Sequence, residues 1–316
     1  MAEQATRWRR TGRAKALVVL QLVVTLALIG WLISKIDKQA LDAALALDPW
    51  IACAAVLVFA SAQIWGGLRL HALVPDGKVT SGEAIRTTFV GYFFANFLPS
   101  TVGGDVVRGI RLKSAGVGLG ELAGVLVLDR VINTLFIAAV ALAVTPLVRS
   151  LLPNLDWRLL LIVAALACAA AACVILPAGR VSTVRSSLYE VVAPSLVLAR
   201  RPARLGIVIM MTAASLASGI GGQWLLGLAM DIPIEFVKFA GIACAITLVG
   251  LIPISFNGIG LQEAGYVTTL TALEIAQPHA VAFAFAVRLM ILVTSLLGGL
   301  VFLAEPLVIK ARAPDV

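Results

Sequence analysis

Long runs of apolar residues, separated by short polar connections, dominate the pattern of this chain. A helix that crosses a bilayer needs about 20 mostly apolar residues. Six runs meet this requirement without interruption, and each predicts one full transmembrane helix: 16–34, 50–70, 122–145, 157–177, 205–230 and 280–303. The connections between them are short, so we expect no soluble catalytic domain.

Two further apolar regions, 84–112 and 236–276, are interrupted by proline and glycine. The first is broken at Pro99 and the second at Pro253. Proline and adjacent glycines break a helix and free backbone polar groups. Within a membrane such groups must meet protein, water or a ligand, because lipid cannot hydrogen-bond to them. We therefore predict that each region forms a re-entrant helical hairpin that enters and leaves on one side and lines a midplane cavity.

The two breaks resemble each other in sequence. The first reads NFLPSTVGGD and the second reads GLIPISFNGIG. Each break is followed by a short helix-like run and then by a full span that contains an arginine. Three full spans separate the breaks, and an odd number of crossings turns the second unit upside down. The pattern predicts two oppositely oriented re-entrant hairpins in an inverted repeat, with units at about 83–145 and 235–303.

Composition agrees with a membrane protein. Of 316 residues, 60% are hydrophobic and 13% are charged, and the mean hydropathy is +1.01. Soluble domains carry roughly 45–50% apolar and about 25% charged residues. The fold class is therefore an all-α polytopic membrane protein. The four cysteines lie in apolar runs and the two histidines are far apart, so we expect neither a metal site nor a cofactor.

The net charge of +8 does not indicate a nucleic-acid partner, because the basic residues lie in short connections beside the apolar runs. With a cytoplasmic N-terminus, 18 of the 25 Lys and Arg residues fall in cytoplasmic segments and 5 in outer segments. This bias is the positive-inside pattern. It predicts a basic cytoplasmic N-terminus, a single transmembrane domain whose first span is retained, and a cytoplasmic tail: 1–15, 16–308 and 309–316.

Three charged residues lie well inside predicted spans, away from their ends: Asp129, Arg130 and Arg288. An intramembrane charge costs at least a few kcal/mol and usually marks a functional pathway. Asp129 and Arg130 point about 100° apart on a helix and are poor partners for each other. Asp105 and Glu263 are more plausible partners for the two arginines. A guanidinium suits phosphate, so we predict that Arg130 or Arg288 holds an anionic headgroup. Alternatively, such pairs merely lock helices together.

Polar residues at the breaks add a second kind of anion site. Ser100, Thr101, Ser255 and Asn257 suit the N-cap of a helix that resumes there. A helix N-terminus offers amide donors and partial positive charge, so two N-termini could face one headgroup. The candidate substrate-binding residues are Asn96, Pro99, Ser100, Thr101, Gly103, Gly104, Asp105, Arg108, Asp129, Arg130, Ser255, Asn257, Gly258, Gly260, Glu263 and Arg288.

Some of these candidates have a simpler interpretation. Asp105 in the first turn of a helix would stabilise that helix and repel a phosphate. It is then a partner for a basic residue or a proton-coupling group. Arg108, Arg111 and Lys113 are most simply cytoplasmic anchors beside anionic lipid headgroups.

Three ordered motifs make the chain resemble a known family. Residues 96–108, NFLPSTVGGDVVR, and 252–264, IPISFNGIGLQEA, are similar to two signatures of the flippase-like membrane family, and 127–130, VLDR, resembles a third. That family includes the N-terminal membrane domain of bacterial lysylphosphatidylglycerol synthase/flippase proteins. The resemblance extends over about residues 15–308.

The resemblance implies translocation of an anionic or phosphate-containing lipid, a phospholipid or a polyprenyl-phosphate lipid, across the bacterial cytoplasmic (inner) membrane. The two-part relatives also carry a soluble aminoacyl-transferase domain. This chain shows no such domain, so we expect a transporter and not an enzyme. Two alternatives stay open: a non-transporting partner subunit of an envelope-synthesis complex, and a membrane-embedded transferase that uses a lipid-linked donor. A homo-oligomer is compatible with each of them.

Overall fold

The structure is a computed structural model that describes residues 47–74, 77–97, 103–148, 201–252 and 255–312, and five single residues elsewhere. All regular elements in these ranges are helical. In chain order they are α3 (Pro49–Leu73), α4 (Ser81–Phe97), α5 (Gly103–Ser114), α6 (Leu119–Val148), α9 (Pro202–Leu228), α10 (Phe236–Gly250), the 3-10 turn η2 (Phe256–Gly258), α11 (Leu261–Ala272) and α12 (Gln277–Arg312).

Four of these helices are long and apolar enough to cross a membrane: α3, α6, α9 and α12. They coincide with four of the six predicted spans, and the other two, 16–34 and 157–177, lie outside the described ranges. The helical architecture and these spans confirm that the chain is a multi-pass α-helical membrane protein.

Each interrupted region forms two short helices. Region 84–112 is divided between α4 and α5, and region 236–276 between α10 and α11. The longest of the four, α4, has 17 residues, which corresponds to about 25 Å and is less than the roughly 30 Å of a bilayer core. In each region the two short helices contact each other. The breaks are where the sequence predicts them, and insertion of the pairs as re-entrant hairpins stays a prediction.

Local sequence explains where two of the helices begin. The Asp48 carboxylate accepts a 2.8 Å hydrogen bond from the Trp50 backbone N–H, and Pro49 occupies the first turn of α3. Before α4, Thr80 and Glu83 form a reciprocal capping box. The hydrogen bond from the Thr80 backbone N–H holds the pKa of the Glu83 carboxyl below its usual value.

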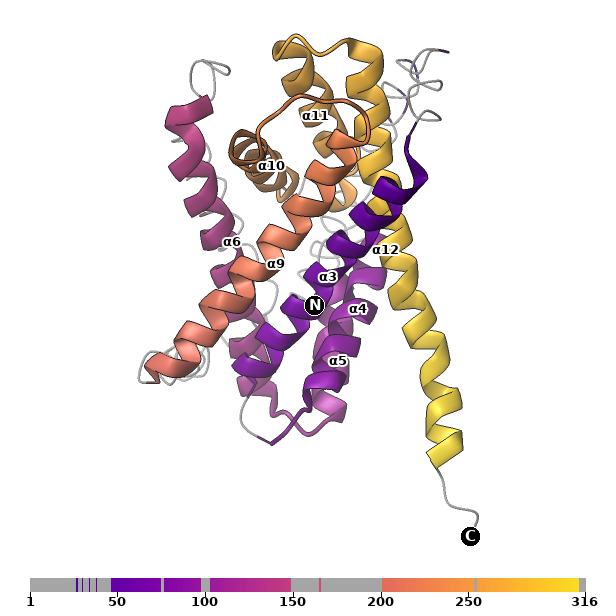
Figure 1. The fold of residues 1–316 in the computed structure, drawn as a ribbon. Coiled ribbons are helices and arrows are strands. Elements are labelled where there is room, and N and C mark those ends of the chain that lie inside the picture. The colour runs from indigo at the N-terminus through magenta and orange to yellow at the C-terminus, as the bar shows by residue number, and fades with distance from the viewer. Residues whose placement is uncertain are drawn as a thin grey trace, which may run out of the picture.

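The described helices form two halves with the same order of elements: α3 to α6, and α9 to α12. Packing between the halves is reciprocal. The helix α3 packs along α9, α4 packs against α12, and α10 packs against α6. In Figure 1, α6 rises from the lower end of the molecule while α12 descends from the upper end. The pair α10 and α11 lies at the upper end, and α5 lies at the lower end. The long helices α6 and α12 therefore run in opposite directions (Figure 1).

A glycine lies at each of the three crossings between the halves. A Cβ at Gly222 of α9 would come within 2.7 Å of the Ala55 carbonyl oxygen of α3. A Cβ at Gly241 of α10 would lie 2.5 Å from Val144 of α6, and one at Gly298 of α12 would clash with the Phe89 carbonyl oxygen of α4. Small residues at crossings let membrane helices approach closely, which increases van der Waals contact where lipid supplies no hydrophobic force.

Two apolar clusters surround the polar centres. The larger one contains the mutually packed rings of Phe239, Tyr266 and Phe283 from α10, α11 and α12. The smaller one joins the C-terminal end of α3 to α5 and to the first turns of α6 and α9, through Leu70 and Leu112 among others. Both clusters hold the short helices against the long ones and so fix the positions of the charged side chains between them.

Candidate functional site

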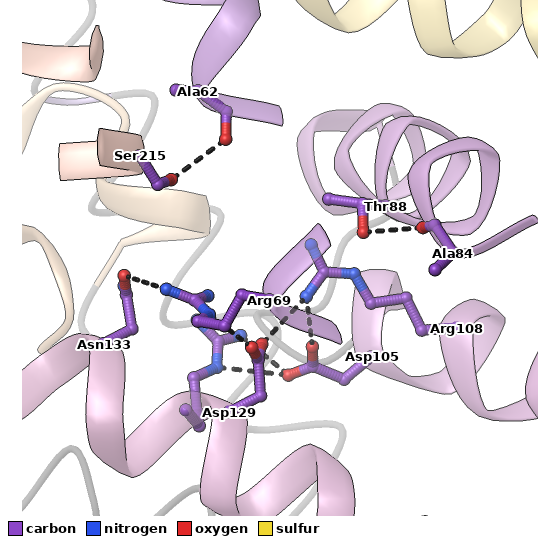
Figure 2. A network of polar contacts seen from close by, with 10 residues as sticks. Ala62, Arg69, Ala84, Thr88, Asp105, Arg108, Asp129, Asn133 and Ser215 are labelled. Atoms are coloured by element: carbon purple, nitrogen blue, oxygen red, sulfur yellow. Dashed lines mark hydrogen bonds and ion pairs between the residues drawn. The ribbon is translucent and has the colours of Figure 1, made fainter. Parts of the chain in front are cut away.

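Five charged side chains from three helices meet between α3, α5 and α6: Arg69, Asp105, Arg108, Asp129 and Arg130. The most buried pair is Arg69 with Asp129, whose side chains are only 7% and 8% exposed. Arg69 Nε donates a 2.7 Å hydrogen bond to Asp129 Oδ1, and its Nη1 donates to Asn133 Oδ1 at 3.0 Å. Figure 2 shows Arg69 between these two residues of α6. This pair ties α3 to α6.

The second pair joins α5 to α6. Arg130 donates from Nη2 and Nε to Asp105 Oδ2, over 2.7 and 3.2 Å. Asp105 is buried, whereas 36% of the Arg130 side chain is exposed. The predicted partnership of Arg130 with Asp105 is confirmed, and no ion pair joins Arg130 to its neighbour Asp129 among the described contacts. The partly exposed Arg130 side chain leaves this end of the cluster accessible to a ligand or to solvent.

Arg108 lies between the two carboxylates without a hydrogen bond to either. Its Nη1 is 3.7 Å from Asp105 Oδ1 and 3.6 Å from Asp129 Oδ2, and its buried Nε has no hydrogen-bond partner. Figure 2 shows its side chain reaching toward both acids. The side chain crosses Gly91 of α4, where a Cβ would lie 2.7 Å from Arg108 Cγ and Nε. Gly91 therefore provides the space in which this guanidinium lies.

A second centre lies in the other half. Glu263 of α11 accepts a hydrogen bond from Arg288 Nε of α12, as the sequence predicts. Both side chains are largely buried, and Arg288 Nη2 is a buried donor without a partner. The two centres share one spacing, because Asp105 and Arg130 are 25 residues apart and so are Glu263 and Arg288. In each half a short helix supplies the acid and the following long helix supplies the arginine.

The two breaks are joined directly by a pair of amides. Asn257 Nδ2 donates to Asn96 Oδ1 over 2.8 Å, and Asn96 donates to the Tyr92 carbonyl oxygen at 2.9 Å. Asn257 has a left-handed backbone with φ 46°, and the neighbouring Gly258 has φ 72°. Ser255 is fully buried and its Oγ has no partner. Pro99, Ser100 and Thr101 lie outside the described residues.

The structure corrects the predicted N-caps of the second break. The N-cap of α11 is Gly260, at φ 82°, and neither Ser255 nor Asn257 occupies that position. The Gly260 backbone N–H donates to Glu263 Oε2 at 2.7 Å. A backbone N–H at the N-terminus of α11 thus already binds the protein's own carboxylate. The helix α5 begins with Gly103 and Gly104, and its first turn likewise contains an acid, Asp105. The guanidinium groups are therefore better candidates for an anion than the helix N-termini are.

Two participants were not among the predicted site residues. Arg69 is one of the 18 basic residues of the predicted cytoplasmic segments, and the structure instead buries it against Asp129. Two features of the sequence point to these participants. Arg69 lies inside an apolar run, and Asn133 lies one helical turn after Asp129. The anchoring role expected of Arg108 and Arg111 also needs correction. Arg108 faces two acids, and Arg111 Nη1 donates to Glu305 Oε2 of α12 at 2.7 Å.

Comparison with known proteins identifies the family. The family model described as the lysylphosphatidylglycerol synthase TM region matches residues 18–299. No curated protein matches the chain. The match covers most of the chain, and the chain belongs to this family. It is therefore a membrane protein of a family linked to lipid handling.

Proposed function

We propose that this member of the lysylphosphatidylglycerol synthase TM region family moves a phosphate-containing lipid between the leaflets of a bilayer. The chain acts as a transporter and performs no chemistry on the lipid. The substrate is an anionic phospholipid or a polyprenyl-phosphate lipid, and the membrane is the bacterial cytoplasmic membrane with both termini inside. The lipid headgroup passes the charged centres while the acyl or prenyl chains stay in the bilayer.

The repeated acid–arginine centre carries this proposal. In each half, an ion pair joins a short helix to a long one, with the same spacing of 25 residues. Buried charge is costly in a membrane protein and is usually retained for transport or binding. Two equivalent centres, in halves whose long helices α6 and α12 run in opposite directions (Figure 1), support an inverted repeat, the arrangement in which many transporters place a binding site at the repeat interface. The equal spacing makes Asp105 equivalent to Glu263. An alignment of Pro99 with Pro253 would instead place Asp105 four residues, or about one helical turn, before Glu263.

The broken regions complete the proposed route. We interpret the pairs α4–α5 and α10–α11 as re-entrant hairpins, since each pair of short helices is joined at a break and packs on the long helix of the other half. The Asn96–Asn257 hydrogen bond connects the two breaks. A headgroup that passes between the halves would have to separate these amides or move around them.

A reconstitution assay tests this function. Purified protein in liposomes should move a fluorescent phosphatidylglycerol between leaflets faster than empty liposomes do. Arg130→Gln and Arg288→Gln should each slow this movement at least about tenfold, since a charge-assisted hydrogen bond is worth roughly 1.5–3 kcal/mol. Lys238→Gln is the matched control, because it removes one positive charge from a partly exposed surface pair of α10.

The assay also separates transport from the alternatives. Equal rates in protein-containing and empty liposomes for every phosphate-containing lipid tested would contradict transport and favour a partner subunit. A modified lipid in the same vesicles, found by mass spectrometry, would favour a transferase. Movement that both arginine variants retain in full would leave transport standing but remove these centres from it.

A further inference from the structure

We propose that Arg108 is the residue that holds the lipid phosphate, and that the first centre takes a group with a single negative charge. The inference rests on the proposed function and assigns its site. Arg130 and Arg288, the residues favoured by sequence, each already pair with a carboxylate. Arg108 differs from them in both charge balance and hydrogen bonding.

The charge balance of the first centre leaves one positive charge. Arg69, Arg108 and Arg130 supply three guanidinium groups, and Asp105 and Asp129 supply two carboxylates. The hydrogen bonds of both acids go to Arg69 and Arg130. Arg108 Nη1 is too far from either acid for a hydrogen bond, at 3.6 and 3.7 Å. Arg108 is therefore the surplus cation within the described part of this cluster.

Burial makes this surplus unfavourable without a ligand. The Arg108 side chain is 19% exposed and its Nε is a buried donor without an acceptor. Leaving a charged donor unsatisfied costs more than an ordinary lost hydrogen bond. An anion beside the exposed part of this side chain would supply the missing negative charge. A phosphodiester carries one negative charge and oxygens spaced for two parallel hydrogen bonds from arginine.

The second centre lacks this surplus charge, although Arg288 Nη2 is also a buried donor without a partner. There the residue three positions after the acid is Tyr266, where the first centre has Arg108. Tyr266 is neutral, and its hydroxyl donates to Gln223 of α9. Glu263 and Arg288 balance each other, so the second centre has no surplus cation among these residues. The two halves are therefore unequal, and only the first is charged to receive an anion.

A lipid-binding experiment tests this assignment. The purified protein in detergent would be titrated with phosphatidylglycerol, or with diacylglycerol of the same chains, and the bound lipid measured by native mass spectrometry. The wild-type protein should prefer phosphatidylglycerol, and Arg108→Gln should weaken that binding at least about tenfold while leaving diacylglycerol binding unchanged. Lys238→Gln removes one partly exposed positive charge from α10 and should bind as wild type does. Soluble glycerol phosphate, added as a competitor, separates a free phosphate ligand from a lipid headgroup.

Each outcome supports or overturns the assignment. Equal phosphatidylglycerol binding by Arg108→Gln and wild type overturns it, as does an equal loss in Lys238→Gln, which would show unspecific charge attraction. Displacement of the lipid by glycerol phosphate at comparable concentration would identify a phosphate site without lipid selectivity and overturn the lipid claim. If Arg108→Gln does not fold, Arg108→Lys keeps the charge and should retain part of the binding. Arg108-dependent binding without transport would contradict the proposed function alone.

Discussion

The side-chain amide of Asn257 donates a 2.8 Å hydrogen bond to Asn96, a residue 161 positions earlier in the chain. This contact joins the 3-10 turn η2 to the last turn of α4 and so connects the two breaks. Both amides are partly buried, and their hydrogen bond links the two halves through side chains.

Removing that amide should loosen the connection between the breaks. Asn257→Gly retains the left-handed backbone of φ 46° and should lower stability by about 0.5–1.5 kcal/mol, the usual net value of a hydrogen bond. Asn257→Ala should cost roughly 1 kcal/mol more than Asn257→Gly, because alanine is strained in the left-handed region and glycine is not. Thermal unfolding in detergent measures both. A double-mutant cycle with Asn96→Ala isolates the pair, and additive effects would contradict a direct bond.

Breaking the Arg69–Asp129 pair should be far more damaging. Arg69→Met leaves a buried carboxylate without its closest partner, which typically costs about 3–5 kcal/mol. The double variant Arg69→Met/Asp129→Leu removes both charges and should recover much of the loss. The yield of monodisperse protein and its melting temperature are the measurements. The pair Lys78 and Glu121, which is much more exposed, is the comparison, and Lys78→Gln should change stability by less than about 1 kcal/mol.

The space above Gly91 should matter for binding more than for folding. Gly91→Ala places a Cβ 2.7 Å from Arg108 Nε, and a flexible arginine can move away at small cost. We expect a folded protein in which phosphatidylglycerol binding falls about tenfold, since roughly 1.4 kcal/mol of binding energy corresponds to that factor. The melting temperature and native mass spectrometry would be measured together.

Gly104→Ala provides the contrasting variant for Gly91→Ala. Its Cβ would lie 2.5 Å from the Gly91 carbonyl oxygen, a backbone atom that cannot move aside. We expect it to lower the melting temperature by more than Gly91→Ala does. Wild-type binding by a stable Gly91→Ala protein would argue against the role of Arg108.

The crossing of α4 and α12 should depend on the absence of a side chain at Gly298. A Cβ there would clash with the Phe89 carbonyl oxygen, so Gly298→Ala must separate the two helices. We expect a loss of about 1–3 kcal/mol, as for other overpacked positions. A Cβ at Gly219 of α9 would meet no described atom within 4 Å, so Gly219→Ala should be neutral or slightly stabilising. Similar melting temperatures for both variants would contradict the close crossing.

The amino-acid sequence alone determines the class of the protein and much of its helical layout. The four long described helices coincide with predicted spans, because a run of about 20 apolar residues is sufficient to define a membrane helix. The breaks near Pro99 and Pro253 are also local signals. Even the partners Asp105 and Glu263 could be predicted, since few acids occur near the spans and a buried arginine needs one.

The tertiary structure decided which charges are shared and which one is left over. The pairing of Arg69 with Asp129 depends on how α3 is rotated against α6. The local sequence of either helix does not specify this rotation. The surplus at Arg108 follows only when three helices are counted together, and its position requires Gly91 on a fourth. Hydropathy is a property of consecutive residues, whereas charge pairing arises from distances between helices that are packed by the whole fold.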